Sequence, residues 1–194
     1  MGFSNVEYVR STLRGGYIMQ LMSVPVPSLD RTIFHEVGHL FIGRYFGIKY
    51  DGSVAVRIIF SEEHVTYLKS DYEENDSIEI VLYKIILSMA GKELEKKRIG
   101  DVLEEGTIED DKKIRHLEDI LQKYWRKNID EKKLEEICGS ILIDNNNVID
   151  ELYCYIKKEI LTGKFDIGID DVEKILNKFN ISRNNISFPD NIFI

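Results

Sequence analysis

The chain has 194 residues, which is enough for one domain with a well-formed core and rather short for two. Hydrophobic residues make up 43% and charged residues 31% of the chain, a composition that excludes a disordered or collagen-like protein. The net charge is −8 and the lysines and arginines do not cluster, so we expect no binding to nucleic acid or to an anionic membrane.

The cysteines and the apolar runs of the sequence indicate where in the cell the protein is expected. Cys138 and Cys154 are the only cysteines, and their spacing fits neither a metal site nor a disulfide framework. No apolar run reaches the roughly 18 residues that cross a membrane, and the N-terminus lacks a cleavable hydrophobic region. We therefore expect no membrane span and a cytoplasmic protein with reduced cysteines.

The N-terminal part predicts an extended lead-in followed by a buried helix. Residues 1–27 show little periodicity and end in alternating valine and proline. Ser28 or Asp30 can then cap a helix whose apolar residues lie around nearly its whole circumference, and Gly47 can end it. A helix that is apolar on most sides is expected to be central.

A hairpin and a long helix are expected next. Alternating apolar residues predict a strand over Val54–Phe60, a turn over Ser61–His64 and a second strand that ends at Leu68. After an acidic loop, Asp76 with Glu79 three residues later is typical of the cap of a helix, which we expect to pack beside the first one.

The rest of the chain predicts further helices. Thr107 with Asp110 indicates the start of one helix, and Asp130 indicates the start of a shorter one. The asparagines at 145–147 interrupt the pattern before another helix, and a last helix is expected over Asp171–Phe179.

These elements predict a mainly α (α+β) fold with a small β-hairpin. We expect one domain over residues 28–180, preceded by the lead-in 1–27 and followed by a polar C-terminal tail over residues 181–194.

The first helix carries the pattern His35-Glu36-Val37-Gly38-His39. Because residues four apart share a helix face, His35 and His39 can both direct a ring nitrogen to one zinc ion, with Glu36 beside the open position. The alternative is that both are core histidines bonded to backbone carbonyls, with Glu36 paired to Arg31 or Arg44. Two imidazoles and a carboxylate in so apolar a helix need a partner, which favours the metal.

A catalytic zinc ion normally has three protein ligands, so a third is expected elsewhere in the chain. Asp110 is preferred because the first turn of a helix holds a carboxylate rigidly. The same position suits an ordinary capping residue, so spacing alone leaves both interpretations open. The candidates are Glu62, Glu63, His64, Asp71, Glu73, Glu74, Glu95, Asp110, Asp111 and His116, with Glu62 and Glu63 better explained as turn residues.

Three stretches resemble the peptidase domain of the FtsH family, the membrane-anchored ATP-dependent zinc proteases. Phe34–His39 is similar to the family's Y-H-E-A-G-H, Ala90–Glu95 to its A-G-R-x-A-E, and Gly106–Asp110 to its G-A-S-N-D. The likeness covers about residues 30 to 178 and implies a zincin-like helical metallopeptidase domain. It also implies that Asp110 is the third zinc ligand and that Glu95 orients a histidine, although Glu95 also suits a solvated helix surface.

The chain departs from that family in several ways. Lys92 stands where the family has arginine, and Asp111 adds a second carboxylate beside the expected ligand. The sequence contains no G-x-x-x-x-G-K-S/T phosphate loop and no apolar anchor, so we expect a stand-alone domain that cannot unfold substrates by itself.

The expected activity is that of a zinc-dependent endopeptidase acting on unstructured or partner-delivered polypeptides, with Glu36 activating a zinc-bound water. The strand Val54–Phe60 is expected to pair along its edge with an extended substrate. A separate ATPase or further copies of the chain are candidate partners. Because an ATPase module is lacking, the alternative is a catalytically inactive, peptidase-derived metal-binding or regulatory interaction module.

Overall fold

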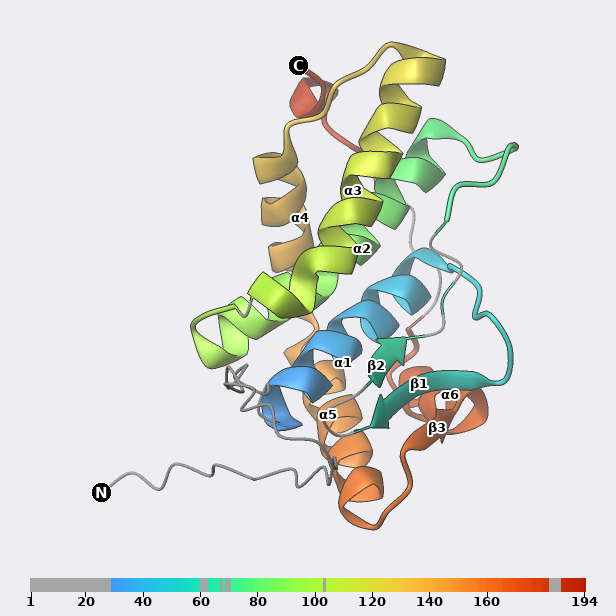
Figure 1. Ribbon diagram of the computed structural model, residues 1–194, viewed down its shortest axis with the longest axis vertical. Helices are drawn as coiled ribbons and strands as arrows, with labels where there is room; N and C mark the ends of the chain where they lie inside the picture. The colour runs from blue at the N-terminus through green and yellow to red at the C-terminus, as the bar shows by residue number, and fades with distance from the viewer. Residues whose placement is uncertain (1–28, 60–62, 67, 69–70, 103, 182–185) are drawn as a thin grey trace, which may run out of the picture.

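The computed structural model describes residues 29–59, 63–66, 68, 71–102, 104–181 and 186–194. The predicted lead-in 1–27 lies outside the described residues. The elements, in chain order, are α1 (Leu29–Phe46), β1 (Val54–Ile59), β2 (Glu63–Thr66), α2 (Ile78–Ile99), α3 (Glu104–Trp125), α4 (Glu131–Asp144), α5 (Asn146–Leu161), β3 (Asp166–Gly168), α6 (Ile169–Lys178) and the 3-10 helix η1 (Asp190–Ile192) (Figure 1). The prediction of a mainly helical fold with a small antiparallel sheet is confirmed.

Helix α1 is the central element. Its buried residues lie on every side of the helix, as the apolar pattern predicted. It packs against α2 and α5, and the sheet lies along a further side (Figure 1). The helix ends at Phe46, and Gly47 follows with a φ of 70°, the left-handed conformation that glycine adopts without strain.

Helix α2 lies between α1 on one side and α3 and α4 on the other. The predicted cap at Asp76 is wrong, because the hydroxyl of Ser77 accepts the hydrogen bond from the backbone N–H of Ile80. Asp76 instead forms an ion pair with the buried Lys84, with its Oδ2 2.7 Å from the ammonium nitrogen. The buried ammonium of Lys84 needs a negatively charged partner. The Asp76 carboxylate therefore pairs with Lys84 and does not cap the helix.

The sheet has three antiparallel strands in the order β2-β1-β3. The second strand begins at Glu63, so Glu63 and His64 pair with Ile59 and Ile58 and do not form the predicted turn. Strand β3 was not predicted. Because β1 is hydrogen-bonded on both sides, the expectation that it offers a free edge to a substrate is wrong.

The later helices follow the predicted order with shifted ends. Helix α3 begins at Glu104, so the cap predicted at Thr107 is wrong and Asp110 lies in the second turn. The cap at Asp130 is confirmed, since its side chain accepts from the backbone N–H of Lys133. Asn145 alone separates α4 from α5.

The segment predicted as a polar tail packs onto the helices where it is described. Ile192 is fully buried, and its carbonyl accepts a hydrogen bond from the backbone N–H of Asp130 at 2.8 Å. Ile129 and Phe193 pair as an isolated antiparallel bridge. Apolar side chains therefore tie the C-terminal end to the start of α4.

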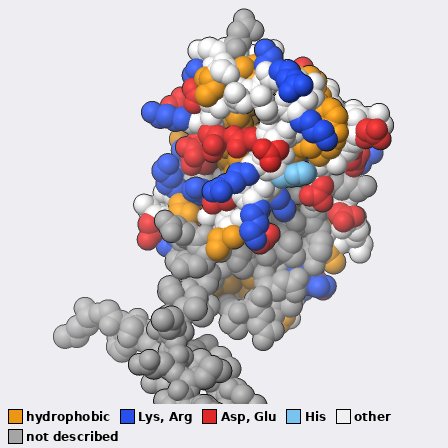
Figure 2. All heavy atoms as spheres, turned by 45° about the horizontal axis from the view of Figure 1, so that its top comes forward, with side chains coloured by type: hydrophobic (Ala, Val, Ile, Leu, Met, Phe, Trp, Pro, Cys, Tyr) orange, Lys and Arg blue, Asp and Glu red, His pale blue; other side chains and the backbone are white. Residues whose placement is uncertain are grey.

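None of the helices in the described ranges is both long and apolar enough to cross a membrane. On the face shown in Figure 2, groups of acidic and basic side chains lie next to one another, with hydrophobic side chains between them. Charges of the two signs therefore interleave on that face.

Candidate metal centre

Helix α1 brings the two histidines of the pattern together. His35 and His39 are buried, with 4% and 8% of their surface exposed, and their rings lie edge to face with centroids 4.7 Å apart. The four-residue spacing on a helix places them on one face, as predicted.

One ring nitrogen of each histidine is held by a neighbour on α2. The Nδ1 of His39 donates to the backbone carbonyl oxygen of Leu87 at 2.8 Å. The Nδ1 of His35 lies 2.7 Å from Oε1 of Glu95 and donates to it. A carbonyl and a carboxylate can only accept, so both Nδ1 atoms carry a proton, and a ring without a second proton keeps its lone pair on Nε2.

Asp110 extends from α3 toward the Nε2 atoms of the two histidines. Its Oδ2 lies 3.1 Å from Nε2 of His35 and 3.2 Å from Nε2 of His39, and the two Nε2 atoms are 3.1 Å apart. Three electron-pair donors therefore converge within a buried space, where a cation or a proton must lie between them. Among the described residues, these three form the one group with the geometry to hold a metal ion.

The donor set fits zinc. Ligand atoms at about 2.0–2.1 Å from a tetrahedral zinc ion lie about 3.3–3.4 Å from one another, close to the distances between these three atoms. Two imidazoles with one carboxylate is also a donor set of catalytic zinc sites, which keep a fourth position open.

The electrostatics of the triad favour a positive charge at its centre. Burial lowers the pKa of His35, but the hydrogen bonds with Asp110 and Glu95 and the charge of Glu36 outweigh burial and raise this pKa to about 10. Burial disfavours the charged form of Asp110, but the charge of His39 and the hydrogen bonds from both histidines hold its pKa well below the usual range. Both shifts favour a positive charge between the three donor atoms.

Glu36 is the remaining residue of the pattern. It follows His35 on α1, has 2% of its surface exposed, and lies close enough to raise the pKa of His35. The alternative expectation pairs Glu36 with Arg31 or Arg44. The structure places Arg31 against Glu95 and Arg44 against Glu173.

Two glycines allow the close approach of α1 and α2 at this site. A Cβ on Gly38 would lie 2.5 Å from the carbonyl oxygen of Ala90, and a Cβ on Gly91 would lie 2.6–2.7 Å from three atoms of the His35 ring. The sequence singled out both glycines only as part of a resemblance, and their physical role becomes visible where the two helices cross.

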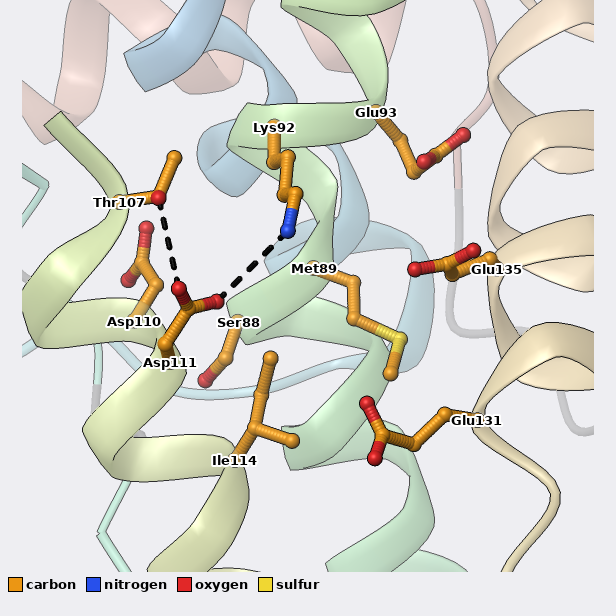
Figure 3. A pocket seen from close by; sticks show the side chains of 10 residues that line it. All are labelled: Ser88, Met89, Lys92, Glu93, Thr107, Asp110, Asp111, Ile114, Glu131 and Glu135. Atoms are coloured by element: carbon orange, nitrogen blue, oxygen red, sulfur yellow. Dashed lines mark hydrogen bonds and ion pairs between the residues drawn. The ribbon is translucent and has the colours of Figure 1, made fainter. Parts of the chain in front are cut away.

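Asp111, the second carboxylate of α3, faces a neighbouring pocket. Its side chain accepts a hydrogen bond from the hydroxyl of Thr107 at 3.5 Å and lies 3.9 Å from the ammonium of Lys92 (Figure 3). Glu131 and Glu135 of α4 face the same pocket from the other side, and Asp110 also belongs to its lining. Asp111 is not part of the group formed by His35, His39 and Asp110.

Among the side chains that the structure describes, none of the other candidate ligands joins the triad. Glu73, Glu74 and His116 are exposed. Glu95 holds the far nitrogen of His35, as the resemblance implied for a residue that orients a histidine. Glu62 lies outside the described residues, and only the backbone of Glu63 and His64 is described.

Residues that the sequence analysis missed surround the triad. The carbonyl of Leu87 fixes the His39 ring, and Arg31 contacts Glu95 and Asp101. Arg31 lies four residues before His35, so its place on the same helix face was the one available signal. The contact of the Leu87 carbonyl with His39 could not be predicted, because every residue type has a backbone carbonyl.

A comparison of the sequence with protein-family models gives no match, and a comparison with curated proteins gives none either. The function is therefore inferred from the residues and geometry of the site.

Proposed function

We propose that this chain is a zinc-dependent peptidase in which His35, His39 and Asp110 hold the metal and Glu36 is the general base. The observation that carries the proposal is the convergence of two Nε2 atoms and one carboxylate oxygen, each 3.1–3.2 Å from the others. The resemblance to the FtsH peptidase domain adds the reaction class, the hydrolysis of peptide bonds.

Some protein groups would hold the metal ion, and Glu36 would transfer the proton. When bound, zinc would act as a Lewis acid that activates water and polarises the peptide carbonyl. Glu36 accepts the proton of the water whose oxygen attacks the peptide carbonyl carbon, and it returns that proton to the amine nitrogen as the C–N bond breaks. Glu95 and the carbonyl of Leu87 keep the two imidazoles in the tautomer that presents Nε2.

The substrate that we propose is an unstructured polypeptide, or one delivered by a partner such as a separate ATPase. Peptide hydrolysis at a fixed site needs an extended chain, and the resemblance covers only the peptidase part of its family. We also propose a cytoplasmic location, since Cys138 is buried, Cys154 is exposed, and both are free thiols.

The experiment that tests the function compares zinc content with cleavage. We expect the purified protein to contain about one zinc ion per chain, by elemental analysis, and to degrade unfolded casein. Glu36→Gln should retain the zinc and lose cleavage by about 10²- to 10⁴-fold. Glu109→Gln is the matched control, because Glu109 is an exposed carboxylate beside Asp110 that pairs with Lys112.

The outcomes separate the two functions considered. Full cleavage by Glu36→Gln would contradict the role of Glu36 as general base. Bound zinc without cleavage of any unfolded substrate by the unsubstituted protein would support the metal-binding regulatory module instead.

A further inference from the structure

Arg31 connects three segments around the metal centre. It lies one helical turn before His35 on α1, with only 12% of its side chain exposed. Its Nη1 donates to Oε2 of Glu95 at 3.1 Å and to the backbone carbonyl of Asp101 at 3.2 Å, and its Nη2 donates to the Asp101 carboxylate. The Arg31 guanidinium thus bridges two acidic residues that both lie outside α1.

The first of these contacts acts on the orientation of His35. Glu95 uses one carboxylate oxygen for Nδ1 of His35 and the other for Arg31. Because only 3% of the Glu95 side chain is exposed, its negative charge needs a buried partner, and Arg31 supplies a positive charge. A carboxylate fixed at both oxygens holds the imidazole rotation more tightly than one fixed at a single oxygen.

The second contact acts on the helix that carries Asp110. Asp101 follows Gly100, the left-handed residue that ends α2, and it lies in the short connection to α3. Figure 1 shows the start of α1 beside this connection. Arg31 therefore holds the connection between α2 and α3 at Asp101, three residues before α3 begins and nine before Asp110.

We propose that Arg31 is a positioning residue of the metal centre, whose forked contacts with Glu95 and Asp101 hold His35 and Asp110 in ligand geometry. The inference rests on the proposed function, since it requires a metal at the triad. Lysine cannot replace arginine here, because a single ammonium does not present the planar fork that reaches both partners.

The test measures metal binding in four variants of the full chain. Zinc affinity is determined by competition with a chromophoric chelator, and the visible absorption of the Co²⁺-substituted protein reports the ligand geometry. We expect Arg31→Met to weaken zinc binding by about 10- to 100-fold and to change the cobalt spectrum. Arg31→Lys should recover only part of the affinity, and Asp101→Ala should weaken binding less than Arg31→Met, because the contact with Glu95 remains.

Arg44→Met is the matched control. Arg44 lies at the other end of α1 and forms its own ion pair with Glu173 at 3.0 Å. Its loss removes an arginine ion pair from the same helix without touching the triad, so zinc affinity and the cobalt spectrum should stay unchanged.

Unchanged zinc affinity and an unchanged cobalt spectrum in Arg31→Met would overturn the inference. If that variant does not fold, Arg31→Lys and Asp101→Ala decide, since the Asp101 side chain is 72% exposed and its loss leaves the core intact. Unaltered affinity in both would then overturn it. Zinc binding without cleavage by the unsubstituted protein contradicts the proposed peptidase and leaves this inference standing, whereas absence of zinc binding overturns both.

Discussion

Gly91 on α2 lies directly against the imidazole of His35 on α1. A Cβ at position 91 would come within 2.6 Å of Cε1 and 2.7 Å of both ring nitrogens. One ring nitrogen bonds Glu95 and the other faces Asp110, so the ring cannot shift without losing one of them. The smallest side chain in the sequence thus leaves the space in which the proposed metal ligand His35 lies.

We expect Gly91→Ala to weaken zinc binding by about 10-fold or more, because the displaced ring no longer directs Nε2 toward His39 and Asp110. The overpacking should also lower the free energy of unfolding by about 1–3 kcal/mol, part of which the higher helix propensity of alanine offsets. Chelator competition and urea unfolding measure the two effects.

Gly139→Ala on α4 is the control for that substitution. Its added Cβ would meet the ammonium end of Lys97 at 2.9 Å, and such a flexible end can move away. Zinc affinity should stay unchanged, and stability should stay equal or rise by up to about 1 kcal/mol. Equal zinc affinity in the two alanine variants would contradict the role given to Gly91.

The crossing of α1 and α2 predicts a second contrast, between two glycines of α1. In Gly38→Ala the new Cβ would lie 2.5 Å from the backbone oxygen of Ala90, so the two helices must separate. In Gly43→Ala it would lie 2.5 Å from Cδ1 of Leu68, a side chain that can rotate. We expect Gly38→Ala to cost about 3 kcal/mol and Gly43→Ala clearly less, by urea unfolding. Equal losses of unfolding free energy in the two variants would contradict this, because α1 and α2 could then move apart at little cost.

Local signals made much of the helical fold predictable. Gly47 and Asp130 act through their own backbone conformation or side chain, and both end or begin a helix where the sequence indicated. Strand β3 spans only Asp166–Gly168 and pairs with β1, more than a hundred residues earlier in the chain. Neither a periodicity nor a turn signal can reveal so short a strand, because its pairing partner is distant.

The site was predictable in part for the same reason. The four-residue spacing of His35 and His39 is a local property of a helix, so it could be recognised without the fold. For Asp110 the spacing left a ligand and a cap equally open. The cap is excluded because α3 begins at Glu104, a boundary that the residues around Thr107 did not indicate.

Lys84 provides a stability prediction away from the site. It is 4% exposed, and its ammonium donates to the carbonyl of Asp71 and to the carboxylate of Asp76. Lys84→Met leaves a largely buried carboxylate without its cation, so we expect a loss of about 3 kcal/mol in the free energy of unfolding. Adding Asp76→Asn should recover part of that loss, because it removes the unpaired charge.

The control for Lys84 is Lys92, on the same helix. Its ammonium lies 3.9 Å from Asp111, and both side chains are about two-fifths exposed, at 41% and 40%. Lys92→Met should change stability by no more than about 0.5 kcal/mol. A double variant of Lys84 and Asp76 that is no more stable than Lys84→Met alone would contradict the explanation by charge pairing.

Zinc itself should stabilise the fold through the triad. A ligand that binds only the folded state raises the free energy of unfolding by about 4 kcal/mol at a thousandfold excess over its Kd, so the thermal midpoint should fall with EDTA and recover with zinc. His39→Ala removes a ligand whose Nε2 lies 3.2 Å from Asp110, and its midpoint should no longer respond to zinc. His116→Ala, which removes an exposed histidine of α3, should respond like the unsubstituted protein. A full zinc response in His39→Ala would place the ion elsewhere, since the two remaining triad residues cannot complete three protein ligands.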